Sequence, residues 1–67
     1  MERNIQLDWK SIVEEAVRRR QEQGLTQAEL AVLAGVSKPT LNRFEQGRTN
    51  VTLENAFKVL RALGLLG

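Results

Sequence analysis

The segment from Thr26 to Gly47, TQAELAVLAGVSKPTLNRFEQG, constrains the fold of this chain more than any other stretch. Thr26 and Glu29 have the spacing of a capping box, in which each side chain satisfies an exposed backbone group at the start of a helix. Gly35 suits a helix end, because glycine adopts left-handed backbone angles without steric cost. Ser37 is the expected cap of a second helix, and Gly47 ends it. The segment therefore predicts two short helices joined by a tight turn.

The second helix of this pair has two chemically different faces. Leu41, Phe44 and Glu45 share one side through spacings of three and four residues. The other side carries cations and amides together with one proline: Lys38, Pro39, Asn42, Arg43 and Gln46. Cationic and amide side chains make the bidentate hydrogen bonds that distinguish guanine and adenine edges. The two helices are therefore a candidate helix-turn-helix.

Two further amphipathic helices are expected, one on each side of this pair. The first begins after Asp8 and ends at Gly24, with an apolar stripe formed by Trp9, Ile12, Val13, Ala16 and Val17. The last begins after Thr52 and ends at Gly64, with an expected buried face of Leu53, Ala56, Phe57, Leu60 and Leu63. Residues 1–7 form an N-terminal arm. Residues 1–67 are thus expected to be one all-α domain.

The three aromatic residues are expected in the core. Trp9, Phe44 and Phe57 occupy apolar helical positions, so packing explains them better than stacking on bases. The run Arg18-Arg19-Arg20 is, in the same way, more typical of a solvated helix face than of a nucleic-acid patch.

Composition excludes several classes of chemistry. The chain has no cysteine and no histidine, which removes a thiolate nucleophile and both the commonest general base and the commonest zinc ligand. Its eight carboxylates show no paired arrangement for acid–base work. We therefore expect no enzymatic activity, no metal and no cofactor. No apolar run approaches the roughly 18 residues of a membrane helix, and no signal peptide is apparent, so the expected location is cytoplasmic, without a membrane partner.

The net charge of +2 is unevenly distributed. Residues 1–35 hold five Lys and Arg against six Asp and Glu, whereas residues 36–67 hold five against two. The positive excess therefore begins where the second helix of the pair begins. A surface that faces phosphates requires such a placement.

The residues TQAELA, AGVS and T-L-x-R-F-E-x-G, in this order and spacing, resemble the lambda-repressor/Cro-like helix-turn-helix family of bacterial and phage DNA-binding regulators. The resemblance covers about Val13 to Gly64. With the four helices expected from the residues, it implies a small lambda-repressor-like domain with the helix-turn-helix at residues 26–47, although the phage repressors of the family have a fifth helix. It also implies that the second helix of the motif lies in the major groove of double-stranded DNA.

The resemblance further implies roles for individual residues. The positions that face bases in the family are held here by Lys38, Pro39 and Arg43. The positions expected to contact the DNA backbone are Gln27, Asn42, Arg48 and Thr49. Pro39 departs from the polar residue usual at its position. Because its side chain offers no hydrogen bond, it could read only shape or a thymine methyl group.

Arg20 and Glu45 are predicted to form an ion pair. Each lies at the edge of an otherwise apolar face, where a lone charge would be costly. The matching residues pair across the domain in the phage repressors that the chain resembles. The main effect of the pair would be to orient the first helix against the second helix of the motif, and its net contribution to stability would be smaller.

The preferred interpretation is a sequence-specific repressor that binds a pseudo-palindromic operator as a homodimer. We expect the dimer surface at the apolar residues near the two ends, Ile5, Leu7, Leu65 and Leu66. A second interpretation is an antitoxin that represses its own operon and binds a protein toxin, because the ending KVLRALGLL resembles short antitoxins of the HipB type. A third is a helix-turn-helix used only for protein interaction.

Overall fold

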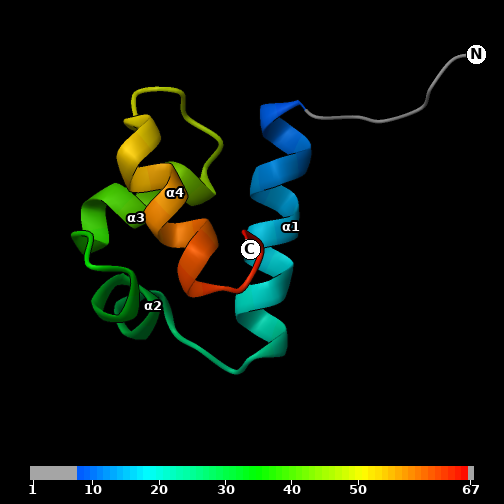
Figure 1. The fold of residues 1–67 in the computed structure, drawn as a ribbon, viewed down its shortest axis with the longest axis vertical. Helices are drawn as coiled ribbons and strands as arrows, with labels where there is room; N and C mark the ends of the chain where they lie inside the picture. The colour runs from blue at the N-terminus through cyan, green and yellow to red at the C-terminus, as the bar shows by residue number, and fades with distance from the viewer. Residues whose placement is uncertain (1–7, 67) are drawn as a thin grey trace, which may run out of the picture.

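A computed structural model describes residues 8–66, and these form four helices without a strand. The helices are α1 (Trp9–Glu22), α2 (Gln27–Ala34), α3 (Lys38–Glu45) and α4 (Leu53–Ala62). Helix α2 packs against α3 and α4, and α1 packs against α3. Figure 1 shows α1 along one side of the domain and the α2–α3 pair on the other. The predicted all-α fold with four helices is confirmed.

Each helix begins at a cap that the sequence predicts. Asp8, Thr26, Ser37 and Thr52 each accept a hydrogen bond from the backbone N–H three residues further along the chain. The capping box of α2 is complete, since the backbone N–H of Thr26 also donates to Glu29 Oε1 over 2.8 Å. Gly35 ends α2 with a φ of 74°, a left-handed conformation that strains other residue types. These local signals determine where α2 begins and ends and where α3 begins.

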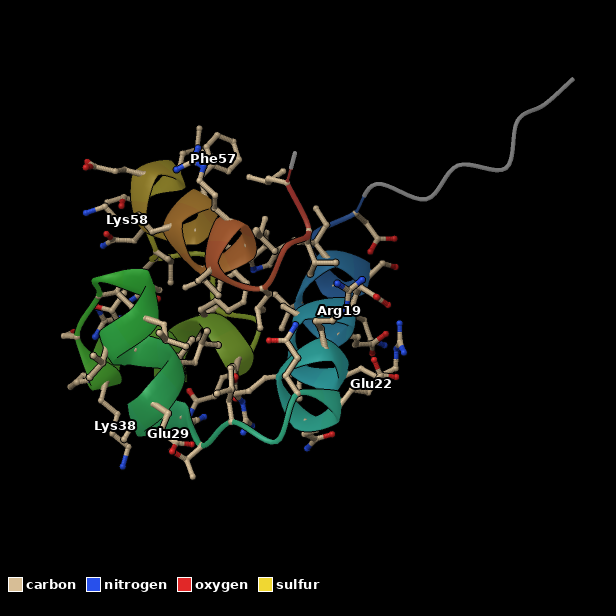
Figure 2. The ribbon with its side chains drawn as sticks, turned by 60° about the horizontal axis from the view of Figure 1, so that its bottom comes forward. Arg19, Glu22, Glu29, Lys38, Phe57 and Lys58 are labelled. Carbon is tan, nitrogen blue, oxygen red and sulfur yellow. The ribbon has the colours of Figure 1, made fainter. Side chains whose placement is uncertain are left out.

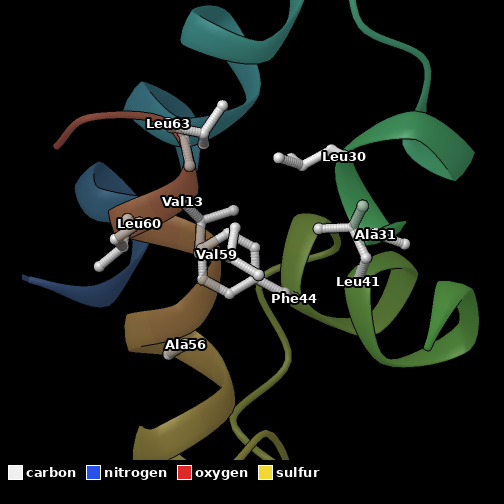
Figure 3. Packing of buried hydrophobic residues seen from close by; sticks show 10 residues of the cluster. Val13, Leu30, Ala31, Leu41, Phe44, Ala56, Val59, Leu60 and Leu63 are labelled. Atoms are coloured by element: carbon white, nitrogen blue, oxygen red, sulfur yellow. The ribbon is translucent and has the colours of Figure 1, made fainter. Parts of the chain in front are cut away.

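Ten buried apolar side chains from all four helices form the core: Val13, Ala16, Leu30, Ala31, Leu41, Phe44, Ala56, Val59, Leu60 and Leu63 (Figure 3). Phe44 is fully buried near the centre of this cluster. The ring of Trp9 meets the Phe44 ring edge to face, with centroids 5.4 Å apart and planes at 89°. The expectation that Trp9 and Phe44 pack in the core is confirmed.

The predicted buried face of α4 is partly wrong. Ala56, Leu60 and Leu63 are buried as expected, but Leu53 is 71% exposed and Phe57 is 43% exposed. Val59 is buried instead. The contact stripe of α4 runs along Ala56, Val59, Leu60 and Leu63, which rotates Phe57 away from α2 and α3. Phe57 projects from the domain surface in Figure 2.

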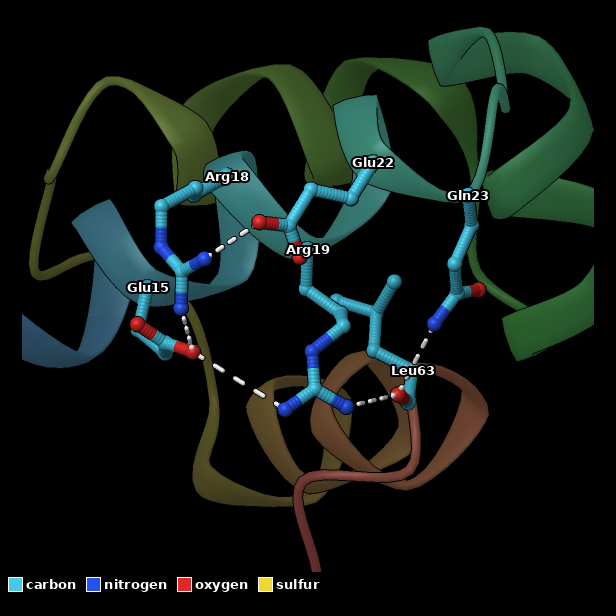
Figure 4. Close-up of polar contacts among 6 residues, drawn as sticks. All are labelled: Glu15, Arg18, Arg19, Glu22, Gln23 and Leu63. Carbon is cyan, nitrogen blue, oxygen red and sulfur yellow. Dashed lines mark hydrogen bonds and ion pairs between the residues drawn. The ribbon is translucent and has the colours of Figure 1, made fainter.

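Arg19 of α1 and Gln23, the C-cap residue of that helix, hold the turn that follows α4 (Figure 4). Arg19 Nη1 and Gln23 Nε2 each donate to the carbonyl oxygen of Leu63 over 3.2 Å. Arg18 instead lies on the solvated face and pairs with Glu15 and Glu22. The hydrogen bond from Arg18 lowers the pKa of Glu15. The three consecutive arginines therefore have three different environments, because Arg20 points to α3.

Of the four apolar residues expected at the dimer surface, the structure describes two, Leu65 and Leu66. Leu65 and Leu66 are half-buried against the core, so they are less exposed than the sequence suggests. Ile5 and Leu7 belong to the predicted arm, which lies outside the described residues.

Candidate nucleic-acid interface

Helix α3 presents its polar side chains to solvent. Lys38, Pro39, Asn42 and Gln46 are exposed, while Thr40, Leu41 and Phe44 face the core. Figure 2 shows Lys38 extending into solvent on the side of α2 and α3, away from Phe57. The predicted split between an inner and an outer face of α3 is thus present for these residues.

Gln27 lies beside this outer face although it belongs to α2. Gln27, Lys38, Pro39 and Asn42 line one shallow hollow where the starts of α2 and α3 meet. The hollow combines an ammonium group, two amides and the N-terminal turns of two helices. These are the groups that bind phosphate oxygens and base edges. Pro39 fits here without disturbing α3, because proline is tolerated in the first helical turn.

Arg43 is less outward than its position in the sequence suggests. Its side chain is half-buried, and its Nη2 donates to Thr40 Oγ1 over 3.2 Å. Its Nε is shielded from solvent without a hydrogen-bond partner among residues 8–66. Thr40 Oγ1 also accepts a hydrogen bond from Ser37 Oγ over 2.8 Å. Thr40 therefore directs the guanidinium of Arg43, a role that sequence reasoning missed although the spacing of three residues indicates contact.

The connection after α3 brings Arg48 and Thr49 to the surface. Both residues are exposed, and Arg48 Nε donates to Gln46 Oε1 over 2.9 Å. The indole Nε1 of Trp9 donates to the carbonyl oxygens of Gly47 and Arg48, each over 3.1 Å. Sequence reasoning placed Trp9 in the core and missed these bonds. The sequence does offer one indication of these bonds, because the N–H of a partly buried indole needs a hydrogen-bond acceptor.

The predicted Arg20–Glu45 pair is present and bidentate. Arg20 Nε lies 2.7 Å from Glu45 Oε2, and Arg20 Nη2 lies 3.1 Å from Glu45 Oε1. The two side chains are only 14% and 8% exposed. Gln27 Nε2 donates to the same Glu45 Oε1 over 2.7 Å, and Arg20 Nη1 donates to the Leu25 carbonyl over 2.9 Å. The pair therefore joins α1 to α3 and orients the amide of Gln27 at the edge of the outer face.

Within residues 8–66 no cluster of three or more side chains could hold a metal ion. No helix of the same range is long and apolar enough to cross a membrane.

Comparison with known proteins identifies the class that this geometry suggests. The family model described as "Helix-turn-helix" matches residues 18–66. The chain therefore belongs to the helix-turn-helix family of DNA-binding transcriptional regulators. The matched range contains α2, α3 and α4 entirely, together with Arg20 and Glu45.

Individual relatives agree with this assignment. An uncharacterized HTH-type transcriptional regulator of Haemophilus influenzae is 39% identical over 54 residues, which cover 81% of this chain and 55% of the relative. Antitoxin HipB of Escherichia coli K12 is 44% identical over 46 residues, covering 69% of this chain and 52% of HipB. A regulator of Methanothermobacter thermautotrophicus is 47% identical over 45 residues, or 67% and 65% of the two chains. The chain spans about half the length of the first two relatives.

Proposed function

We propose that this protein is a sequence-specific repressor that reads double-stranded DNA with the outer face of α3. The observation that carries the proposal is the meeting of Gln27, Lys38 and Asn42 around one exposed hollow at the starts of α2 and α3. In the proposed complex Lys38 and Arg43 contact base edges, and Pro39 contacts a thymine methyl group. Backbone contacts come from Gln27, Asn42, Arg48 and Thr49.

The proposed complex contains two copies of the chain on a pseudo-palindromic operator. One domain of this size contacts too few base pairs to select a single site in a genome, and a two-fold dimer doubles the site. A hollow between α1, α4 and the end of the chain offers an apolar surface for the second copy. It is lined mainly by Ile12, Phe57, Leu60, Leu65 and Leu66.

An antitoxin is the second candidate function. Two HipB antitoxins match, at 44% and 41% identity, over 46 residues each. In this case the protein would bind both its operator and a protein toxin. A pull-down with the product of a neighbouring kinase-like gene tests this candidate, and no complex with that product would favour the simple repressor.

A titration of fluorescent duplexes with random sequence tests DNA binding itself. We expect the wild-type protein to bind, with an affinity that falls as the salt concentration rises, because the Lys and Arg side chains of the protein displace counterions from the DNA phosphates. On the preferred duplexes selected from this pool, Lys38→Ala should weaken binding by roughly tenfold, because it removes a base contact. Arg61→Ala is the control, since Arg61 is an exposed cation on α4 outside the outer face of α3.

Two outcomes would contradict the proposal. A wild-type protein that binds no duplex would favour a protein-interaction module. Equal losses from Lys38→Ala and Arg61→Ala would show that binding depends on total charge and not on the outer face of α3.

A further inference from the structure

Trp9 connects the start of α1 to the segment that follows α3. Its indole Nε1 lies 3.1 Å from the carbonyl oxygens of both Gly47 and Arg48, which are 38 and 39 residues away in the chain. The ring itself is held by its edge-to-face contact with Phe44. Because the ring cannot easily turn, its N–H direction is fixed, and so are the two carbonyl groups that accept from it.

The connection after α3 has few other restraints. Arg48, Thr49 and Asn50 are exposed and lie outside any helix. Arg48 N–H bonds to the Arg43 carbonyl over 3.2 Å, which continues the end of α3. In the described part of the chain, the Trp9 indole makes the only side-chain hydrogen bonds to the backbone of residues 47–50.

The carbonyl contact also sets the direction of one amide. In a planar trans peptide the C=O and the following N–H point in opposite directions. The Arg48 carbonyl points to Trp9, so the Thr49 N–H points away from Trp9. Within residues 8–66 this N–H donates to no acceptor. A free backbone N–H beside the Arg48 side chain is suited to a phosphate oxygen.

We propose that Trp9 is a positioning residue for DNA binding. Its indole holds the Arg48–Thr49 peptide so that the Thr49 N–H and the Arg48 side chain face the DNA backbone together. The inference rests on the proposed function. It adds a residue of α1, far from the recognition helix in sequence, to the groups that determine affinity.

Trp9→Phe tests this role, because phenylalanine keeps an aromatic ring against Phe44 and removes only the donor and one ring of the indole. We expect the dissociation constant for DNA to rise by about tenfold, as for a lost hydrogen bond to a charged group. The rise should be equal for all sequences, since phosphates carry no sequence information. The heteronuclear NOE of the Thr49 amide in the free protein should fall. Val17→Ala is the control for lost apolar volume, because Val17 is a partly buried apolar residue of the same helix outside the proposed dimer surface, and it should change neither quantity.

A chemical variant tests the amide. Replacing the Thr49 amide by an ester in a synthetic chain of 67 residues removes the N–H and keeps the Thr49 side chain, and it also weakens the Arg48 carbonyl as an acceptor for the indole. We expect this variant also to lose about tenfold in affinity. Adding Trp9→Phe to the ester should cost little more, because both changes remove the same phosphate contact.

The possible failures can be told apart. A wild-type protein that binds no duplex overturns the proposed function and, with it, this role of Trp9. Normal affinity in folded Trp9→Phe overturns the role of Trp9 alone. Multiplicative losses in the double variant overturn the link between the indole and the Thr49 amide.

Discussion

Glu45 is a side chain of α3 that accepts hydrogen bonds from two other helices, α1 and α2. Its carboxylate receives the guanidinium of Arg20 from α1 and the amide of Gln27 from α2. All of these groups lie between the core and the outer face of α3. A carboxylate so enclosed depends on its partners, because an unpaired buried charge is costly.

Glu45→Ala should therefore destabilise the protein strongly. It leaves the Arg20 guanidinium buried without its counter-charge, and we expect a loss of about 3 kcal/mol in the free energy of unfolding, measured by urea denaturation. Glu54→Ala removes a carboxylate that is 79% exposed and pairs with Lys58 at 3.6 Å, and should cost less than about 0.5 kcal/mol. Replacing Arg20 and Glu45 together by apolar residues should recover much of the loss. Additive effects in this cycle would show that the pair contributes no coupling.

At the level of single residues, prediction from the sequence succeeds where one local rule decides. The Arg20–Glu45 pair follows from two charges on apolar faces and from the family resemblance. The half-buried state of Arg43 does not follow, because it depends on the hydroxyl of Thr40 in the folded helix. The bonds from Trp9 to Gly47 and Arg48 depend on tertiary packing over 38 residues, which periodicity cannot reveal.

Secondary-structure elements were the most predictable level, since each helix begins at its own cap. The caps at Asp8, Thr26, Ser37 and Thr52 act through neighbouring backbone groups, so the sequence contains the whole interaction. The rotation of α4 was less predictable. Apolar residues lie on more than one side of that helix, and only packing against its neighbours selects Val59 over Phe57.

Gly35 tests whether the turn between α2 and α3 is determined by backbone conformation. An added Cβ at Gly35 would meet no atom within 4 Å, so substitution there has no steric cost beyond its φ of 74°. We expect Gly35→Ala to cost about 1–2 kcal/mol in urea denaturation, and Gly35→Asn to cost less, because asparagine tolerates left-handed angles better. An alanine variant as stable as the wild type would show that this turn does not need the left-handed conformation.

At the scale of the whole molecule, α4 exposes more apolar surface than its sequence pattern predicts. Phe57, predicted to be in the core, instead borders the hollow formed with Ile12, Leu60, Leu65 and Leu66. Phe57 is 43% exposed, so its predicted place in the core is wrong. An exposed aromatic ring beside this hollow supports the proposal that a second copy binds there.

Phe57→Glu should weaken self-association, because it places a charge in the apolar surface that two copies would share. Sedimentation velocity on an operator duplex should show two copies per duplex for the wild type and fewer for this variant at the same concentration. Val32→Glu, at an 80% exposed apolar position on α2, should leave the stoichiometry unchanged. One wild-type copy per duplex at saturation would contradict the dimer.

The central claim is that the outer face of α3 reads base sequence while the connection after it binds phosphates. Selection of bound duplexes from a random library, repeated with Arg43→Ala and with Arg48→Ala, tests this claim most directly. Arg43→Ala should flatten base preference at one position of each half-site, with a loss of roughly 1–3 kcal/mol in discrimination. Arg48→Ala should weaken all sequences equally and reduce the salt dependence by about one ion per subunit. An unchanged preference in Arg43→Ala together with an altered preference in Arg48→Ala would contradict the account.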